Sequence, residues 1–268
     1  MTFSDLALSR RMERAEATAS AKFVEARARV APQSNAEWVE VAGAYAMFDG
    51  KESPISQTFG LGLFAEPSRQ DLDQIEAFFH HREAQVCHEV SPLAGVEVAA
   101  MLVARGYRPI EFTSVMHRPV AAGPQMEAGR LTTRVVRSGE ESLWSRLSVD
   151  GWSDNPELQE FLLDLGIVVA AAEGSVAFLA ELDADPVATG ALRCDGGVAL
   201  FAGASTIPSA RNQGAQRALL EARMRYAVEA GCDLAMMCAA PGSSSQRNAE
   251  RQGFRIAYTR TKWCLGPT

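Results

Sequence analysis

The residues best suited to chemistry lie between an apolar stretch at 198–204 and an amphipathic stretch at 217–228. The first has the length of a buried strand, and the second places its apolar residues at helical spacing. The loop between them carries Arg211 and Gly214 among small and polar residues. Because a helix dipole is positive at its start, backbone N–H groups there bind anions, and Arg211 would add a cation. The pattern predicts a phosphate-binding loop that lacks the Walker lysine and the three glycines of a dinucleotide fingerprint.

The rest of the chain predicts the helices and strands that would position this loop. The periodicity favours a mixed α/β fold. In the first half we expect a helix over 5–30, strands at 38–48 and 58–64, and then alternating helices and strands at 69–82, 85–90, 93–104 and 112–117. In the second half we expect helices at 140–149, 156–165, 217–228 and 244–252, and strands at 131–136, 176–182, 186–194, 198–204, 234–238 and 255–263.

The two halves repeat the same order of elements. Gly106-Tyr107-Arg108 and Gly253-Phe254-Arg255 occupy equivalent places in them, which indicates duplication of a whole α/β domain rather than a solenoid repeat. Residues 119–130 lack periodicity and hold two prolines and two glycines, so they read as a linker. We therefore expect one domain over 1–118 and a second over 131–268.

Composition limits the possible partners. Apolar residues make up 47 % of the 268 residues and charged residues 22 %, as in soluble globular proteins. The net charge of −7 argues against nucleic acid or an anionic membrane as the main partner. No apolar run approaches the roughly 18 residues of a membrane span, and the polar start of the chain shows no signal peptide. A cytoplasmic location is expected.

Neither the cysteines nor the histidines have the spacing of a metal site. The five cysteines are scattered without a CxxC pair, so the sequence supports neither zinc nor a disulfide framework. Cys238 lies in an apolar stretch and reads as an inert core thiol. His80, His81 and His88 lack neighbouring carboxylate or cysteine ligands and read as solvated residues at helix ends. No metal is expected.

The second half resembles the GCN5-related N-acetyltransferase (GNAT) superfamily, in a tandem two-domain form. Its pyrophosphate loop reads Arg or Gln, two residues, Gly, one residue, then Gly or Ala, and Arg211 to Ala215 match while Gln216 departs. Thr206 and Pro208 stand where the family has Val-x-Pro, and Gly253-Phe254 resembles the Gly-Phe after its final helix. The resemblance covers residues 131–263.

This resemblance implies acetyl-CoA as co-substrate, bound beside the strand at 198–206. Backbone groups of Ala204, Ser205 and Thr206 would hold the pantetheine in the manner of an added strand. We expect Gln216 to point along the helix surface, where it would not obstruct a phosphate. The loop residues that would hold the pyrophosphate are Arg211, Asn212, Gln213, Gly214, Ala215 and Gln216, and Ser245 and Asn248 are further expected cofactor contacts.

The catalytic groups are less well defined. The tyrosine that often protonates the departing thiolate in this family is replaced by Ala249. Its possible substitutes are water or the neighbouring Ser243, Ser244, Ser245 and Asn248, although Ser243 also fits a helix cap. An amine nucleophile must lose a proton, and the candidate bases are Asp150, Asp154 and Glu173. Asp154 precedes Asn155-Pro156 and also fits a turn, and Trp152 could line the acceptor pocket or simply pack.

The first copy departs further from the family. The loop at 65–71 has two acidic residues, a proline and no glycine, so it is poorly suited to pyrophosphate and this copy is expected to have lost the cofactor. The chain is thus interpreted as an acetyltransferase acting on a small-molecule or peptide amine, as a monomer or homodimer. Two alternatives stay open: a non-catalytic acyl-CoA sensor, and an acyltransferase acting on a protein partner.

Overall fold

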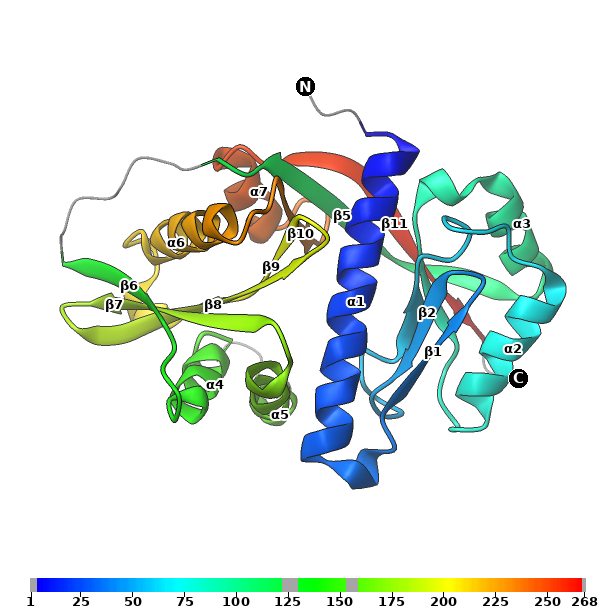
Figure 1. Ribbon diagram of the computed structural model, residues 1–268, viewed down its shortest axis with the longest axis horizontal. Coiled ribbons are helices and arrows are strands. Elements are labelled where there is room, and N and C mark those ends of the chain that lie inside the picture. The colour runs from blue at the N-terminus through cyan, green and yellow to red at the C-terminus, as the bar shows by residue number, and fades with distance from the viewer. Residues whose placement is uncertain (1–3, 122–129, 153–158, 267–268) are drawn as a thin grey trace. The chain divides into compact units, whose positions relative to one another are not determined.

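The computed structural model describes residues 4–121, 130–152 and 159–266, and it has the expected mixed α/β architecture (Figure 1). It contains two compact units, one formed by residues 1–118 with 236–268 and the other by 119–235. The expected second domain ran from 131 to the end of the chain. The C-terminal strand instead pairs with strands of the first half, so residues 236–268 belong with residues 1–118.

The first unit is built on a mixed sheet with the strand order β1-β2-β3-β4-β11-β5-β10. Its short strands β3 and β4 are parallel, whereas β11 runs antiparallel to both β4 and β5. The strands are β1 (Glu37–Val41), β2 (Ala44–Phe48), β3 (Gln57–Phe59), β4 (Cys87–Val90), β5 (Tyr107–Pro119), β10 (Leu234–Ala239), which crosses the boundary between the units, and β11 (Arg255–Leu265).

Helices cover both faces of this sheet, and the sequence of β2 shows why. Because side chains alternate along a strand, Ala44, Ala46 and Phe48 join one core while Met47 joins another. The first core is closed by α2 (Arg69–His80) and α3 (Val96–Ala104), the second by α1 (Leu6–Val30). The expected long amphipathic helix is therefore confirmed. The remaining helix of the unit is α7 (Ser244–Arg251).

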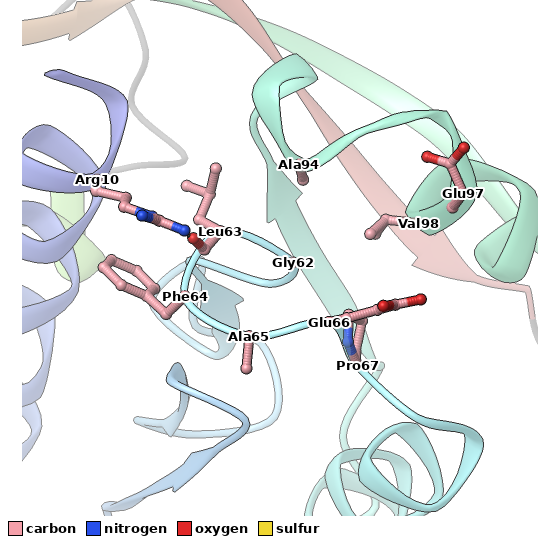
Figure 2. A pocket seen from close by; sticks show the side chains of 10 residues that line it. All are labelled: Arg10, Gly62, Leu63, Phe64, Ala65, Glu66, Pro67, Ala94, Glu97 and Val98. Carbon is pink, nitrogen blue, oxygen red and sulfur yellow. The ribbon is translucent and has the colours of Figure 1, made fainter. Parts of the chain in front are cut away.

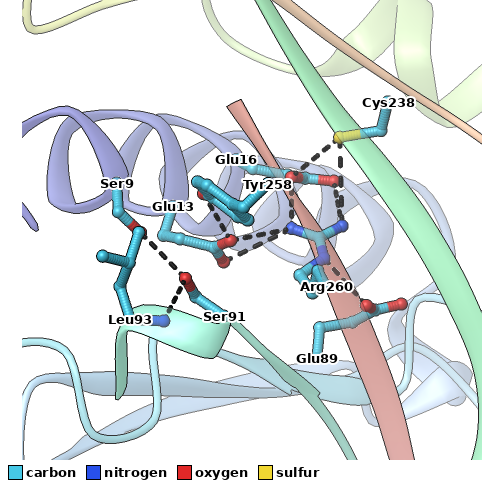
Figure 3. Close-up of polar contacts among 9 residues, drawn as sticks. All are labelled: Ser9, Glu13, Glu16, Glu89, Ser91, Leu93, Cys238, Tyr258 and Arg260. Atoms are coloured by element: carbon cyan, nitrogen blue, oxygen red, sulfur yellow. Dashed lines mark hydrogen bonds and ion pairs between the residues drawn. The ribbon is translucent and has the colours of Figure 1, made fainter. Parts of the chain in front are cut away.

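A cluster of buried charges, which we call the Arg260 cluster, lies between α1 and the sheet (Figure 3). Arg260 forms ion pairs with Glu13 at 3.3 Å, Glu16 at 2.7 Å and Glu89 at 2.8 Å. The Tyr258 hydroxyl donates to Glu13 Oε1 at 2.9 Å. Burial raises the pKa of Glu13 to about 7, against the opposing effect of Arg260. The cluster fixes α1 through polar contacts that the hydrophobic pattern does not reveal.

Two of the cysteines, Cys87 and Cys264, are paired, whereas Cys238 is a free thiol. Cys87 on β4 and Cys264 on β11 face each other in register and form a disulfide, so the expectation of no disulfide was wrong. The pair is separated by 177 residues in sequence, which is why spacing alone did not suggest it. Cys238 donates to Glu16 Oε2 at 3.4 Å, and burial raises its pKa well above the usual value, as expected for an unreactive thiol.

Two further expectations for the first unit were wrong. The strand expected at 58–64 ends at Phe59, because Gly60 and Gly62 have positive φ angles of 82° and 77° and turn the chain. His80 and His81 are exposed as expected, but His88 is fully buried on β4. Burial lowers the pKa of His88 to about 3, so its imidazole is neutral. Within the described residues, no group of three or more potential ligands could hold a metal ion.

The second unit is an antiparallel sheet in the order β9-β8-β7-β6. The expected hairpin is confirmed, because β7 and β8 pair across a turn at Asp183 and Ala184. Helix α6 (Ala215–Glu229) covers one face of this sheet, and α4 (Glu141–Asp150) and α5 (Gln159–Ala171) cover the other (Figure 1). The elements are β6 (Leu131–Val135), α4 (Glu141–Asp150), α5 (Gln159–Ala171), β7 (Ser175–Leu182), β8 (Asp185–Asp195), β9 (Val198–Thr206) and α6 (Ala215–Glu229). No described helix is both long and apolar enough to span a membrane.

Candidate functional site

The strand that precedes the predicted phosphate loop contains a β-bulge. Ala202 faces Ala191 and Ser205 faces Thr189, so the single residue Gly190 of β8 stands opposite two residues of β9. Such an insertion interrupts the ladder and reorients the backbone groups of the bulged strand. Residues 202–204 of β9 are solvent-exposed, in contrast to the buried side chains on either side of them. The bulge therefore leaves part of the β9 backbone accessible to a ligand.

The loop after β9 has the backbone geometry of an anion site. A single 3₁₀ turn at Pro208–Ala210 is followed by Asn212 with φ 64° and by Gly214 with φ 86° at the N-cap of α6. Left-handed residues between helical ones turn successive N–H groups toward one side. The first N–H groups of α6 have no partner within the helix, and the dipole makes this end positive. Residues 211–214 and Arg217 are exposed, whereas Ala215 is buried, so the loop is open to an anion at the start of α6.

Side chains around the loop form hydrogen bonds to backbone carbonyls that fix its conformation. Arg211 is exposed and donates from Nη2 to the carbonyl of Gly151 at 3.1 Å, at the end of α4. Gln213 Nε2 donates to the carbonyl of Ser209 at 3.2 Å. The Ser205 hydroxyl donates to the carbonyl of Ser148 at 2.8 Å. The predicted contacts at Ser205 would therefore involve its backbone, as the strand-addition hypothesis requires.

Gln216, the position that departs from the family pattern, has a different orientation from the one expected. Its Nε2 donates to the carbonyl of Ser205 at 2.7 Å and to Thr206 Oγ1 at 2.9 Å. The side chain therefore points back to the end of β9 and not along the helix surface. It fastens the end of the strand to the start of the helix, and so closes the base of the loop.

The remaining predicted cofactor contacts belong to the other compact unit. Ser245 and Asn248 lie on α7 and are exposed, and Asn248 Oδ1 accepts from Arg251 Nη1 at 3.0 Å. The capping interpretation of Ser243 is confirmed, because its side chain accepts from the Gln246 N–H at 3.1 Å. Ala249, where the family's tyrosine would stand, is only 4 % exposed.

The described candidate bases lie on separate elements of the second unit. Asp154 lies outside the described residues, and Asp150 is the exposed last residue of α4. Glu173 is exposed in the turn before β7, and its carbonyl accepts from Arg193, which faces Leu200 at the start of β9. Four residues separate Leu200 from Ala204, or about 13 Å of strand. Trp152 is 44 % exposed and does not pack into the core.

The equivalent loop of the first copy, between β3 and α2, has the opposite chemistry. Ser68 accepts from the Asp71 N–H at 3.2 Å, and Asp71 Oδ2 accepts from the Ser68 N–H at 2.7 Å. This capping box places a carboxylate at the positive end of α2, where a phosphate would otherwise bind. The hydrogen bond from the Ser68 backbone lowers the pKa of Asp71, so the carboxylate stays ionised at neutral pH.

A hollow of about 520 Å³ adjoins this loop (Figure 2). Among the described lining residues, Glu66 and Glu97 are acidic and Arg10 is basic. Arg10 Nε donates to the carbonyl of Leu63 at 2.6 Å. Because the carboxylates outnumber the cation, the hollow is poorly suited to a diphosphate.

Comparison with solved structures identifies the architecture. A GCN5-related N-acetyltransferase from Kribbella flavida is 21 % identical and superposes with a TM-score of 0.65 over 93 % of this chain and 96 % of its own. A tandem GNAT protein from the clavulanic acid biosynthesis pathway is 14 % identical, with a TM-score of 0.59 over 85 % of this chain and 80 % of its own. The chain has the tandem GNAT fold. By sequence, no family model and no curated protein matches it.

Two side chains that contact the β9 bulge are not among the residues that the sequence singles out. Thr189 Oγ1 donates to the Gly203 carbonyl at 3.1 Å, and Arg223 Nη1 donates to the Ala202 carbonyl at 3.2 Å. Arg223 carried a detectable signal, because it lies four residues from both Leu219 and Ala227 on the buried face of α6. A charge within an apolar stripe marks a residue that needs a partner. Thr189 carried no such signal.

Proposed function

We propose that the chain is an acetyl-CoA-dependent acetyltransferase whose cofactor site is the β9 bulge and the loop that follows it. The observation that carries this proposal is the exposed stretch 202–204 at the β9 bulge, followed along the chain by an exposed loop that opens α6. An accessible strand backbone suits the amides of pantetheine, and a positive helix end suits a diphosphate. The GNAT fold supports the same assignment.

The reaction would be a direct transfer in a ternary complex. An amine attacks the carbonyl carbon of the thioester, and the electron pair of the carbonyl moves onto its oxygen. A backbone N–H of β9 stabilises that oxygen, and holding both reactants in place lowers the entropic cost of the step. Collapse re-forms the carbonyl, breaks the bond to sulfur and leaves an amide. The proton lost by the amine ends on the CoA sulfur, through water or a polar side chain.

The acceptor is proposed only as a class, a small-molecule or peptide amine. The described candidates for proton transfer are Glu173, Asp150 and Ser245, each of which is exposed. An acceptor that arrives as a free amine would need no strong base. The pH dependence of transfer would then follow the pKa of the acceptor rather than that of a protein group.

A second candidate function is a non-catalytic acyl-CoA sensor. The observation in its favour is the buried Ala249, because an alanine side chain cannot protonate a thiolate. The two candidates differ in one measurable result. An acetyltransferase releases CoA thiol when it is incubated with acetyl-CoA and a panel of amines, amino sugars and peptides, whereas a sensor binds acetyl-CoA and releases none. Release with only a protein substrate would favour the third possibility, a protein acyltransferase.

The cofactor site is tested by calorimetry with acetyl-CoA and a matched pair of variants. Gly214 begins α6 and Gly231 follows its last turn, with φ angles of 86° and 74° and open space for a side chain. Gly214→Glu and Gly231→Glu therefore suffer similar backbone strain, but only the first places a carboxylate at the anion site. We expect Gly214→Glu to weaken binding about 100-fold and Gly231→Glu to leave it unchanged. Equal affinities would show that the cofactor binds elsewhere.

A further inference from the structure

Arg223 is a buried cation without a countercharge. It lies on α6, is 3 % exposed, and no carboxylate among the described residues acts on it. Burial lowers the pKa of Arg223 to about 10, so the guanidinium remains charged at neutral pH. A buried, unpaired charge is unfavourable for folding, and an apolar side chain would suit this face of the helix better. A charged side chain at this buried position therefore suggests a role in function.

The surroundings of this guanidinium are shaped to hold it. Its Nε donates to the Leu219 carbonyl at 3.2 Å, and its Nη1 donates to the carbonyls of Ala191 and Ala202, each at 3.2 Å. It lies 5.0 Å from the centre of the Phe201 ring. A Cβ atom at Gly190 would come within 3.0 Å of Arg223 Cζ, so the glycine opposite the bulge makes room for the cation.

The acceptors of these hydrogen bonds determine where the bulge points its N–H groups. In a trans peptide the carbonyl and the N–H of the same unit point in opposite directions. Arg223 holds the Ala202 carbonyl toward α6, so the Gly203 N–H points away from α6. Thr189 holds the Gly203 carbonyl toward β8, so the Ala204 N–H points away from β8. Residues 202–204 are exposed, which leaves these N–H groups accessible.

We propose that Arg223 is a positioning residue for the acetyl group, acting through the Ala202–Gly203 peptide. The inference rests on the proposed function, because it takes the β9 backbone as the donor to the thioester carbonyl. A cation on the peptide oxygen polarises the peptide and strengthens its N–H as a donor. The same buried charge stabilises the oxyanion that forms when the amine attacks. Thr189 supports the next peptide in the same way, without a charge.

The test measures how strongly the bound acetyl carbonyl is polarised. Isotope-edited infrared spectroscopy of [1-¹³C]acetyl-CoA reports the carbonyl stretch, which falls in frequency when a donor polarises the bond. We expect a downward shift on binding to the wild-type protein. Arg223→Met should lose at least half of that shift, and Arg223→Lys, which keeps the charge, should lose less. Arg225→Met, two residues along the same helix, is the control and should retain the full shift.

Affinity provides the second measurement. If Arg223 positions the acetyl group, Arg223→Met should reduce the affinity for acetyl-CoA about tenfold more than the affinity for CoA. If its role is purely structural, the variant should reduce both affinities equally. If Arg223→Met does not fold, Thr189→Val removes the neighbouring hydrogen bond and should also reduce the shift. A full shift in folded Arg223→Met, or in folded Thr189→Val where the first variant cannot be made, would overturn the inference. Absence of acetyl-CoA binding to the wild type would instead overturn the proposed function.

Discussion

The starts of α2 and α6 are equivalent places in the two copies, and they differ in what satisfies their N–H groups. At α2 the Ser68–Asp71 capping box supplies a carboxylate from the chain itself. At α6 the N-cap is Gly214, which contributes no side chain, and the preceding residues are exposed. Both helices have the same dipole. If the start of α6 binds the cofactor as proposed, the difference means that a helix start binds an anion only where the chain leaves its donors open.

The surrounding charges extend the contrast. Glu66 precedes α2 and lines the adjoining hollow together with Glu97, whereas Arg211 and Arg217 flank the start of α6. The first unit has in addition the Arg260 cluster and a disulfide, both of which hold its sheet together. We infer that the first copy contributes stability and the second contributes the cofactor site. The following predictions test this division, from the largest expected effect to the smallest.

The disulfide should contribute to stability and not to binding. Replacing both cysteines (Cys87→Ser with Cys264→Ser) removes a link that closes a loop of 177 residues, and we expect the free energy of unfolding to fall by about 3 kcal/mol. Urea unfolding measures the loss, and calorimetry at 25 °C should give an unchanged affinity for acetyl-CoA. Cys194→Ser, at a free cysteine, is the control. A loss no larger than that of the control would contradict the structural role.

A carboxylate at the start of α6, like the one at the start of α2, should weaken acetyl-CoA binding. Arg217 occupies the third position of α6, as Asp71 does in α2, and its side chain is exposed. Arg217→Asp places a carboxylate near the diphosphate and removes a cation, and we expect about a 50-fold loss of acetyl-CoA affinity, or about 2 kcal/mol. Arg217→Gln, which removes only the cation, should cost a few-fold. Identical losses in the two variants would show that the added carboxylate has no effect.

The Arg260 cluster should make the stability of the first unit depend on pH. Because the pKa of folded Glu13 is raised to about 7 while its usual value is 4.5, the folded state keeps a proton that the unfolded chain releases. The contribution of Glu13 to stability should therefore be largest below pH 4.5, fall as the pH rises toward 7, and level off above it. From pH 5.5 to 6.5 this contribution should fall by about 1 kcal/mol, while the buried, neutral His88 acts in the opposite direction.

Glu13→Gln isolates this contribution, because glutamine does not titrate. Between pH 5.5 and 6.5, the change in the unfolding free energy of this variant, measured by urea unfolding, should differ from the wild-type change by about 1 kcal/mol, because the fall due to Glu13 is absent. Glu25→Gln on the same helix should keep the wild-type difference, since hydrogen bonding to Lys22 and Trp38 gives Glu25 a lowered pKa. An identical response of Glu13→Gln and the wild type to pH would contradict this role of the Arg260 cluster.

Loss of the capping box of α2 should have the smallest effect of these changes on the free energy of unfolding. Ser68→Ala removes the side chain that accepts from the Asp71 N–H, and we expect unfolding to become easier by about 1 kcal/mol. Opening this helix start should not create a second cofactor site, because Asp71 and Glu66 remain. Calorimetry with acetyl-CoA should give the same stoichiometry as the wild type. An increase in stoichiometry would mean that the cap alone excludes the cofactor from the first copy.

Helices and hairpins were predictable from the sequence where the residues that specify them are close together along the chain. The long helix α1 follows from apolar residues at helical spacing, and the β7–β8 hairpin from two strands around a short turn. The strand expected at 58–64 failed because an apolar run also fits a packed turn. The positive φ angles at Gly60 and Gly62 decide between these structures, and they depend on packing against Phe64 and Val98.

The non-local features were not predictable from one sequence. The disulfide depends on strand pairing between distant segments, and the domain to which β11 belongs depends on the same pairing. At the site, the loop was visible because its residues are consecutive. The supports of the bulge come from separate elements, Thr189 on β8 and Arg223 on α6, and only the fold brings them to the same peptides.

The most direct test of the division between the copies is hydrogen exchange, measured by mass spectrometry with and without acetyl-CoA. The account predicts slower exchange on binding for peptides that cover 203–217, where the bulge and the start of α6 supply the donors. It predicts no change for peptides that cover 60–71, where the donors are already satisfied. Protection of 60–71, or equal protection of both loops, would contradict the claim that only the second copy binds the cofactor.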